Sequence, residues 1–129
     1  MGSKETDARI RIDKMLLESG WKLPGWHKDK EINVKTEIKN EHGEADYVLL
    51  NSKGFFLCTV EAKNSSKSPL VGKEKSREYA QSLRSRFIIL SNGIKHYLWD
   101  TKLGNPHLID RLPTQKYLEL RGESFNPPR

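Results

Sequence analysis

The chain has little cysteine and no long apolar run, and each absence excludes a class of protein. Cys58 is the only cysteine among 129 residues, so no disulfide can form within the chain, which suits a reducing cytoplasm. No run approaches the roughly 18 apolar residues that a membrane-spanning helix needs. The four histidines lack the spacing of a zinc site. We therefore expect a cytoplasmic protein with no structural zinc and no membrane contact.

Basic residues are concentrated in the middle of the chain. The formal net charge is +6 at pH 7. Residues 1–50 contain nine Lys/Arg and ten Asp/Glu, whereas residues 51–95 contain nine Lys/Arg and three Asp/Glu. Such a stretch is typical of a surface that binds a polyanion. An ordinary solvated surface explains the composition equally well, so composition alone leaves both interpretations open.

Apolar periodicity predicts one α/β domain. Helical spacing predicts helices over residues 5–19 and 69–84. Alternating or continuous apolar runs predict strands over residues 32–39, 45–50, 55–63, 87–90 and 95–99. The predicted order is therefore α-β-β-β-α-β-β. A central mixed sheet flanked by helices is the economical arrangement, because each helix buries one apolar stripe on the sheet.

Both ends of the chain are expected to lie outside this domain. Residues 1–4 lack the apolar stretch of a signal peptide and are consistent with the remnant of an expression tag. Residues 104–129 are rich in turn residues and end in Asn-Pro-Pro-Arg, which predicts an extension or linker. The predicted domain thus spans residues 5–103.

Charged residues stand at unusual places in the hairpin predicted over residues 45–63. A turn of two or four residues places Asp46 opposite Thr59 or Glu61. In either register Asp46, Glu61 and Lys63 share one face of the sheet, because side chains alternate along a strand. Two carboxylates on neighbouring strands can hold one Mg²⁺ through their oxygens. The backbone carbonyl of Ala62 is a reasonable additional ligand.

These residue types suit the hydrolysis of a phosphodiester. A divalent cation neutralises phosphoryl oxygens and helps to generate hydroxide near neutral pH. Lys63 would stabilise the negative charge that develops or orient the attacking water. The competing interpretation is an ion pair between Glu61 and Lys63 at the solvent end of a strand, because Glu-x-Lys is common by chance.

The same residues resemble the motifs of the restriction-endonuclease-like PD-(D/E)xK superfamily, in particular the N-terminal nuclease domain of type I restriction enzyme R subunits. The similarity covers roughly residues 5–100. It is carried by the first helix up to Gly20-Trp21, by Gly43-Glu44-Ala45-Asp46-Tyr47-Val48-Leu49, by Val60-Glu61-Ala62-Lys63, by Val71-Gly72 with Arg77-Glu78-Tyr79-Ala80, and by Leu90-Ser91-Asn92-Gly93 with Trp99-Asp100.

This resemblance implies a restriction-endonuclease-like fold and a Mg²⁺-dependent endonuclease that cleaves double-stranded DNA, with Mn²⁺ as a substitute metal. It implies metal binding by Asp46 and Glu61 and catalysis by Lys63. Glu5 matches an acidic residue of the family's first helix, which makes it an auxiliary metal ligand. The favourable charge at a helix start explains Glu5 equally well.

The resemblance also points to DNA contacts on the second helix and the loop before it. The residues concerned are Lys67, Lys73, Lys75, Arg77 and Tyr79. Lys75 stands where the family usually has Gln, so a contact through Gln is replaced by one in which Lys reaches a phosphate. For Tyr79, packing on the sheet is the competing interpretation.

In that family the nuclease domain precedes an ATP-driven motor and works with specificity and modification subunits. No Walker-type phosphate loop is present in this sequence, so ATP is expected only for a motor region outside it. Two alternatives stay open. One is a stand-alone resolvase or repair nuclease of the same superfamily. The other is a degenerate nuclease fold that serves as a non-catalytic DNA-binding or subunit-docking module.

Overall fold

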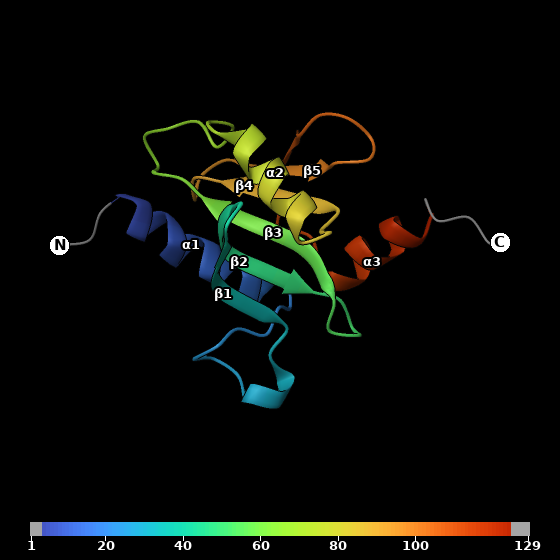
Figure 1. The fold of residues 1–129 in the computed structure, drawn as a ribbon. Helices are drawn as coiled ribbons and strands as arrows, with labels where there is room; N and C mark the ends of the chain where they lie inside the picture. Colours follow the sequence, from blue (N-terminus) through green and yellow to red (C-terminus); the bar gives the residue numbers. More distant parts are fainter. Residues whose placement is uncertain (1–3, 125–129) are drawn as a thin grey trace.

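The computed structural model describes residues 4–124, and the side chains of residues 6–122. Its elements are α1 (Lys4–Glu18), the 3-10 helix η1 (Asp29–Glu31), β1 (Val34–Asn40), β2 (Gly43–Leu50), β3 (Phe56–Ala62), α2 (Lys73–Ser82), β4 (Phe87–Ser91), β5 (His96–Asp100), β6 (His107–Ile109) and α3 (Gln115–Ser124). They are arranged as shown in Figure 1. Within this range, no helix has the length and apolar character needed to cross a membrane.

The strands form one mixed sheet in the order β1-β2-β3-β4-β5-β6. Every neighbouring pair is antiparallel except β3 and β4, which are parallel. Parallel neighbours require a crossover connection, and here α2 supplies it. Short turns join the antiparallel neighbours. The crossover therefore places α2 beside the end of β3.

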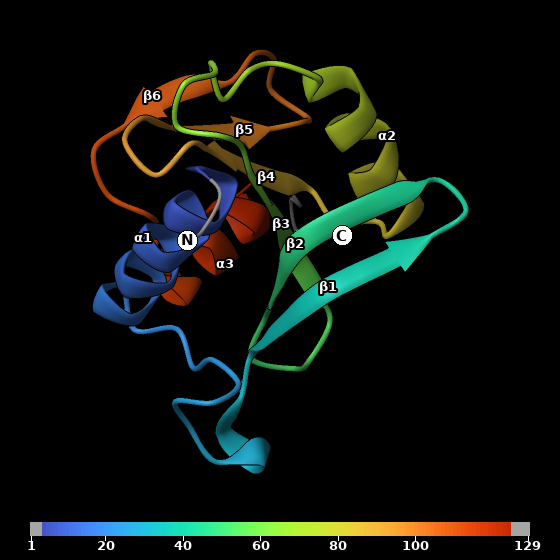
Figure 2. The same cartoon turned by 90° about the vertical axis from the view of Figure 1, so that its left-hand side faces the viewer.

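The helices cover both faces of the sheet: α1 and α3 lie on one side and α2 on the other (Figure 2). The larger core contains Ile12 and Leu16 of α1 and Leu118 of α3, together with Val60 and Phe87 of the sheet. Two smaller clusters lie beneath α2 around Tyr79 and Ala80. The mixed sheet and the order α-β-β-β-α-β-β predicted from the sequence are confirmed.

The structure differs from the sequence prediction after residue 103. Residues 104–129 were predicted to be an extension or linker, yet β6 pairs with β5 and α3 packs into the core through Leu118. Leu112, between them, is also part of that core. The segment after residue 103 packs on the domain because Leu112 and Leu118 cover part of the sheet face that α1 leaves exposed.

The second helix also begins later than predicted. Ser68 Oγ accepts a hydrogen bond from the Leu70 N–H at 3.2 Å, as an N-cap would. Gly72 then adopts a φ of +76°, a left-handed conformation that ends this turn, and α2 begins at Lys73.

Candidate active site

The end of β3 carries the first two residues of the predicted site. Lys63 Nζ lies 3.9 Å from Glu61 Oε1, and their side chains are 25% and 21% exposed. The backbone N–H of Lys63 donates to the Ser91 carbonyl at 2.8 Å. This bond extends the β3–β4 pairing beyond Ala62 and fixes the segment that carries both side chains.

Asp46 lies on β2 where the pairing with β3 stops. Tyr47 pairs with Val60 in the last recorded position, so the next position brings Asp46 opposite Glu61. This is one of the two registers predicted from the sequence. Instead of a ladder bond, Asp46 Oδ2 accepts the N–H of Ala62 at 2.7 Å. A strand N–H points in the plane of the sheet towards the neighbouring strand, so the Asp46 carboxylate that accepts it lies between β2 and β3.

Two hollows flank this point. The larger, of about 500 Å³, is lined by Glu61 and Lys63 together with Glu41, His42, Gly43, Glu44, Gly72, Lys75, Ser76 and Glu78. The smaller, of about 260 Å³, is lined by Asp46 together with Arg9, Glu37, Lys39, Glu44 and Ala45. Glu44 belongs to both. The prediction that Asp46, Glu61 and Lys63 share one face therefore needs correction, because Asp46 borders a different hollow from the other two.

A backbone irregularity accounts for this difference. The β1–β2 pairing passes from Thr36↔Tyr47 to Ile38↔Ala45 and omits Glu37 and Asp46. Glu37 has a φ of +53°, which is unusual for a residue other than glycine. Simple alternation of side chains along β2 thus fails at Asp46.

Arg9 of α1 is a member of this site that the sequence did not indicate. Its NH1 lies 3.0 Å from Glu37 Oε1, and its guanidinium carbon lies 5.5 Å from the centre of the Tyr47 ring. Burial opposes the charge of Arg9, but the hydrogen bonds with Glu37 and Tyr47 and the charge of Asp46 outweigh it and raise its pKa. Arg9 and Glu37 are 28 positions apart, so no local pattern could reveal the pair.

The predicted DNA-contacting lysines and arginine do not form one group. Lys75 is exposed and borders the larger hollow beside Glu61 and Lys63. Lys73 and Arg77 instead turn towards Trp99, at 4.9 and 5.8 Å from its ring centre. Both pair with Glu74, at 3.2 and 2.5 Å. Lys67 is exposed, and its carbonyl accepts the Asn92 side-chain amide at 2.9 Å.

Tyr79 is buried rather than presented to a ligand. It is 1% exposed and packs against Ala45 and Val48 beneath α2. Among the described side chains its hydroxyl finds no hydrogen-bond partner. Burial, followed by the charges of Glu44 and Glu61, raises its pKa. The structure thus matches the packing interpretation of Tyr79, and a direct DNA contact would require it to leave the core.

The donor set suits a magnesium ion better than a transition metal. No group of three or more His, Cys, Asp or Glu that could hold a metal occurs in the part of the chain that the structure describes. The side chain of Glu5, the proposed auxiliary ligand, lies outside the described residues. Two carboxylates and the carbonyl of Ala62 remain, and Mg²⁺ commonly takes one or two protein carboxylates and keeps several waters.

One solved structure resembles this chain closely in fold. It is the structure of a fragment of a "putative HsdR subunit of a type I restriction enzyme" from Vibrio vulnificus, with a TM-score of 0.75 and 24% sequence identity. The match covers 93% of this chain and 25% of that chain, so this chain spans about a quarter of the length of its neighbour. No protein-family model and no curated protein sequence gave a match. The fold is therefore that of the HsdR fragment, as the resemblance to type I restriction enzyme R subunits predicted.

Proposed function

We propose that this chain is a Mg²⁺-dependent endonuclease domain that cleaves double-stranded DNA, of the kind found in type I restriction enzyme R subunits. The observation that carries the proposal is the register that brings Asp46 opposite Glu61 on adjacent strands, at the boundary between the two hollows, with Lys63 Nζ 3.9 Å from Glu61. A motor region that uses ATP, and specificity and modification subunits, belong to the same proposal for a longer protein.

Each residue of the proposed site has a role that follows from its chemistry. Asp46, Glu61 and the carbonyl of Ala62 would hold the ion, which supplies positive charge to the phosphoryl oxygens when bound. The ammonium of Lys63 stabilises negative charge that develops on the phosphate. It is only 25% exposed, so water screens its charge less than on an open surface. Lys75, across the larger hollow, is placed to attract a neighbouring phosphate.

A non-catalytic DNA-binding module is the second candidate, and one observation favours it. Asp46 borders a hollow with Arg9, whose positive charge interacts with that carboxylate. A cation of the protein in this position competes with a metal ion for Asp46. In this second candidate the fold keeps its basic surface but holds no metal between the carboxylates.

Nicking of supercoiled plasmid DNA in Mg²⁺ or Mn²⁺ distinguishes the candidates. We expect cleavage by the unmodified chain and a loss of at least about 100-fold in Lys63→Ala, the usual effect of removing one charge-stabilising donor. Lys95→Ala, which removes an exposed lysine outside the site, is the matched control and should cut normally. Equal cleavage by Lys63→Ala and the unmodified chain would exclude the assigned role of Lys63. DNA binding without any cleavage would favour the module.

A further inference from the structure

A third hollow lies at the other end of the sheet from the nuclease residues. It has a volume of about 330 Å³ and borders the starts of β3 and β4, whereas Glu61 lies near the end of β3 and Lys63 follows it. In Figure 1 the turn between β2 and β3 lies on the right beside α3, while the end of β3 leads to the left. From Phe56 to Lys63 the chain advances roughly 23 Å, at about 3.3 Å per residue. The two sites are therefore separate.

Four basic side chains from different segments line this hollow. Lys53 comes from the β2–β3 turn, Arg84 and Arg86 from the link between α2 and β4, and Lys102 from the segment after β5. Arg86 is neutralised by Asp100, which accepts from its Nε and NH2 at 2.8 and 2.9 Å. Lys53, Arg84 and Lys102 take part in no ion pair among the described residues. Three loops thus place basic side chains that have no ion-pair partner among the described residues around one hollow.

Arg84 holds its place beside the hollow in an unusual backbone conformation. Arg84 follows Leu83, the C-cap residue of α2, and has a φ of +57°, and the Ser85 N–H donates to the Ala80 carbonyl at 2.9 Å. This is the helix-ending geometry in which glycine is the usual residue, because a side chain is strained there. Arg84 therefore lines the hollow in a strained backbone conformation that glycine would adopt without strain.

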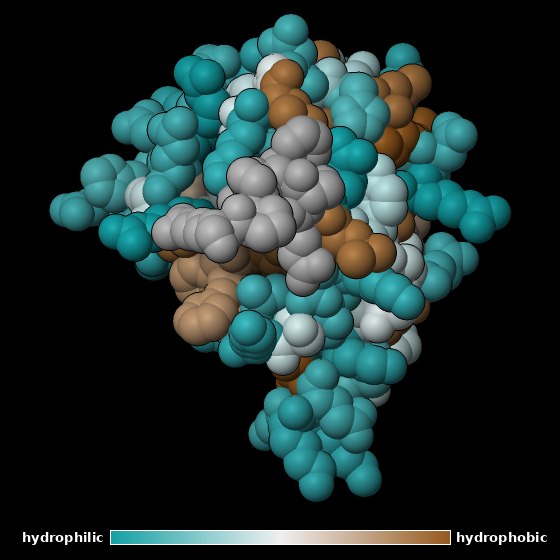
Figure 3. Space-filling model, turned by 90° about the vertical axis from the view of Figure 1, so that its right-hand side faces the viewer, coloured by the Kyte–Doolittle hydropathy of each residue, from teal (hydrophilic) through white to brown (hydrophobic). Residues whose placement is uncertain are grey.

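The turn beside the hollow already binds an anionic group of the protein. The Ser52 backbone N–H and hydroxyl both donate to Glu119 Oε2, each at 2.8 Å. Among the described residues, Glu119 is the only acidic one that lines the hollow, and these two bonds occupy one of its oxygens. Figure 3 shows the end of the molecule that carries α3, where most of the coloured surface is hydrophilic. A multiply charged anion with several oxygens fits these surroundings.

We infer that this hollow binds a phosphate group through Lys53, Arg84 and Lys102. Two sources share this chemistry: the backbone of a DNA duplex and a small phosphate-bearing anion. The first rests on the proposed function. A DNA phosphate held here lies about seven base pairs from the one at Lys63 if the duplex follows β3, at about 3.4 Å per base pair. This contact would fix how the duplex lies on the domain.

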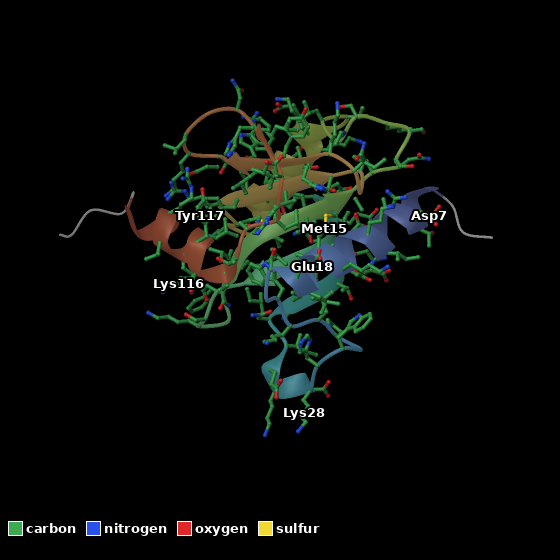
Figure 4. The ribbon with its side chains drawn as sticks, turned by 180° about the vertical axis from the view of Figure 1, so that it is seen from behind. Asp7, Met15, Glu18, Lys28, Lys116 and Tyr117 are labelled. Carbon is green, nitrogen blue, oxygen red and sulfur yellow. The ribbon has the colours of Figure 1, made fainter. Side chains whose placement is uncertain are left out.

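The test compares two triple variants with the same loss of charge. The first is Lys53→Gln/Arg84→Gly/Lys102→Gln, in which glycine suits the backbone at residue 84. The control is Lys22→Gln/Lys28→Gln/Lys30→Gln, which removes three exposed lysines around η1. Figure 4 shows Lys28 at the tip of that segment, away from Lys116 and Tyr117 of α3. Binding of a labelled 20-base-pair duplex is measured in EDTA over a range of salt concentrations.

If the duplex backbone is the ligand, the hollow variant weakens binding at least tenfold. It also reduces the slope of log K against log salt by at least about one unit, since each phosphate contributes about 0.9. The control should leave that slope unchanged. In a second arm, inorganic pyrophosphate is titrated while the backbone amides of residues 51–55 and 84–86 are followed by NMR. Shifts that disappear in the hollow variant, with duplex binding unchanged, assign a small anion instead.

The inference is overturned if neither ligand distinguishes the hollow variant from the unmodified chain, or if both triple variants lose binding equally. Because the assay reads binding without a divalent metal, its failure is separate from a failure of the proposed cleavage. The nicking assay depends on Lys63, which neither triple variant changes.

Discussion

Arg9 is the residue whose charge bears most directly on the proposed metal site. Its guanidinium interacts with the Asp46 carboxylate and is held by Glu37 at 3.0 Å. A protein cation near a metal ligand lowers the affinity for a metal by like-charge repulsion. Sequence patterns could not predict this pair, because both the positive φ of Glu37 and its contact with Arg9 of α1 depend on the tertiary structure.

Removing that charge should strengthen metal binding. We expect Arg9→Gln to raise the affinity for Mn²⁺ roughly three- to tenfold, on the order of 1 kcal/mol for charges separated by several ångströms near the surface. Isothermal titration calorimetry measures the change. Arg11→Gln removes an exposed arginine of the same helix and serves as the control. A lower affinity in Arg9→Gln would show instead that Arg9 orients Asp46 for the metal.

At the scale of elements, the sheet and its first two helices follow from local patterns, whereas β6 and α3 do not. The buried stripe of α1, with Ala8, Ile12 and Leu16 at 0% exposure, has the helical spacing that predicts it. In α3, Leu118 is buried but Tyr117 and Leu120 are exposed, so its apolar residues do not form a buried stripe that the sequence could indicate. Long-range bonds hold this segment, such as Trp21 Nε1 to the Pro113 carbonyl at 2.9 Å.

The contribution of α3 can be measured with one pair of variants. Leu118→Ala should lower the free energy of unfolding by about 2–5 kcal/mol, because it leaves a cavity in the main core. Leu120→Ala makes the same chemical change at a side chain that is 55% exposed, and should cost much less. Chemical denaturation gives both values. Equal, small effects would mean that α3 is not part of the cooperative unit.

The hairpin of β4 and β5 contains a buried histidine with a distinct dependence on pH. His96 is 5% exposed, and its Nδ1 lies 2.7 Å from Ser91 Oγ. Burial lowers the pKa of His96 below the ordinary value of 6.5. The unfolded chain therefore binds a proton at a higher pH than the folded chain does. The contribution of His96 to the free energy of unfolding is therefore fully present above pH 6.5 and falls as the pH decreases towards the folded pKa.

This linkage predicts a slope of at most about 1.4 kcal/mol per pH unit for one histidine. His96→Gln should be less stable overall but should lose that slope below pH 6.5. His107→Gln, at an exposed position of β6, should retain it. Denaturation at a series of pH values gives the comparison. An unchanged slope in His96→Gln would assign the effect to another group.

At the scale of the whole molecule, the sequence predicts the fold better than the arrangement of the candidate site residues. The mixed sheet and the crossover helix depend on local periodicity, and both are confirmed. The hairpin register matches one of the two predicted alternatives, but the pairing also shifts between Leu49 and Leu50, which turn length did not predict. The separation of Asp46 from the hollow of Glu61 and Lys63 depends on a backbone irregularity that no periodic pattern contains. No sequence pattern indicated Lys102, because only the folded chain brings it beside Lys53 and Arg84.

The central claim is that Asp46 and Glu61 together hold a divalent metal beside Lys63. An anomalous-difference map from a crystal of this chain soaked in Mn²⁺ tests it most directly, because it requires neither turnover nor a DNA substrate. We expect a peak between the Asp46 and Glu61 carboxylates and near the Ala62 carbonyl. Well-ordered carboxylates with no peak between them, and Arg9 still against Asp46, would exclude a shared metal at these two residues and favour the non-catalytic module.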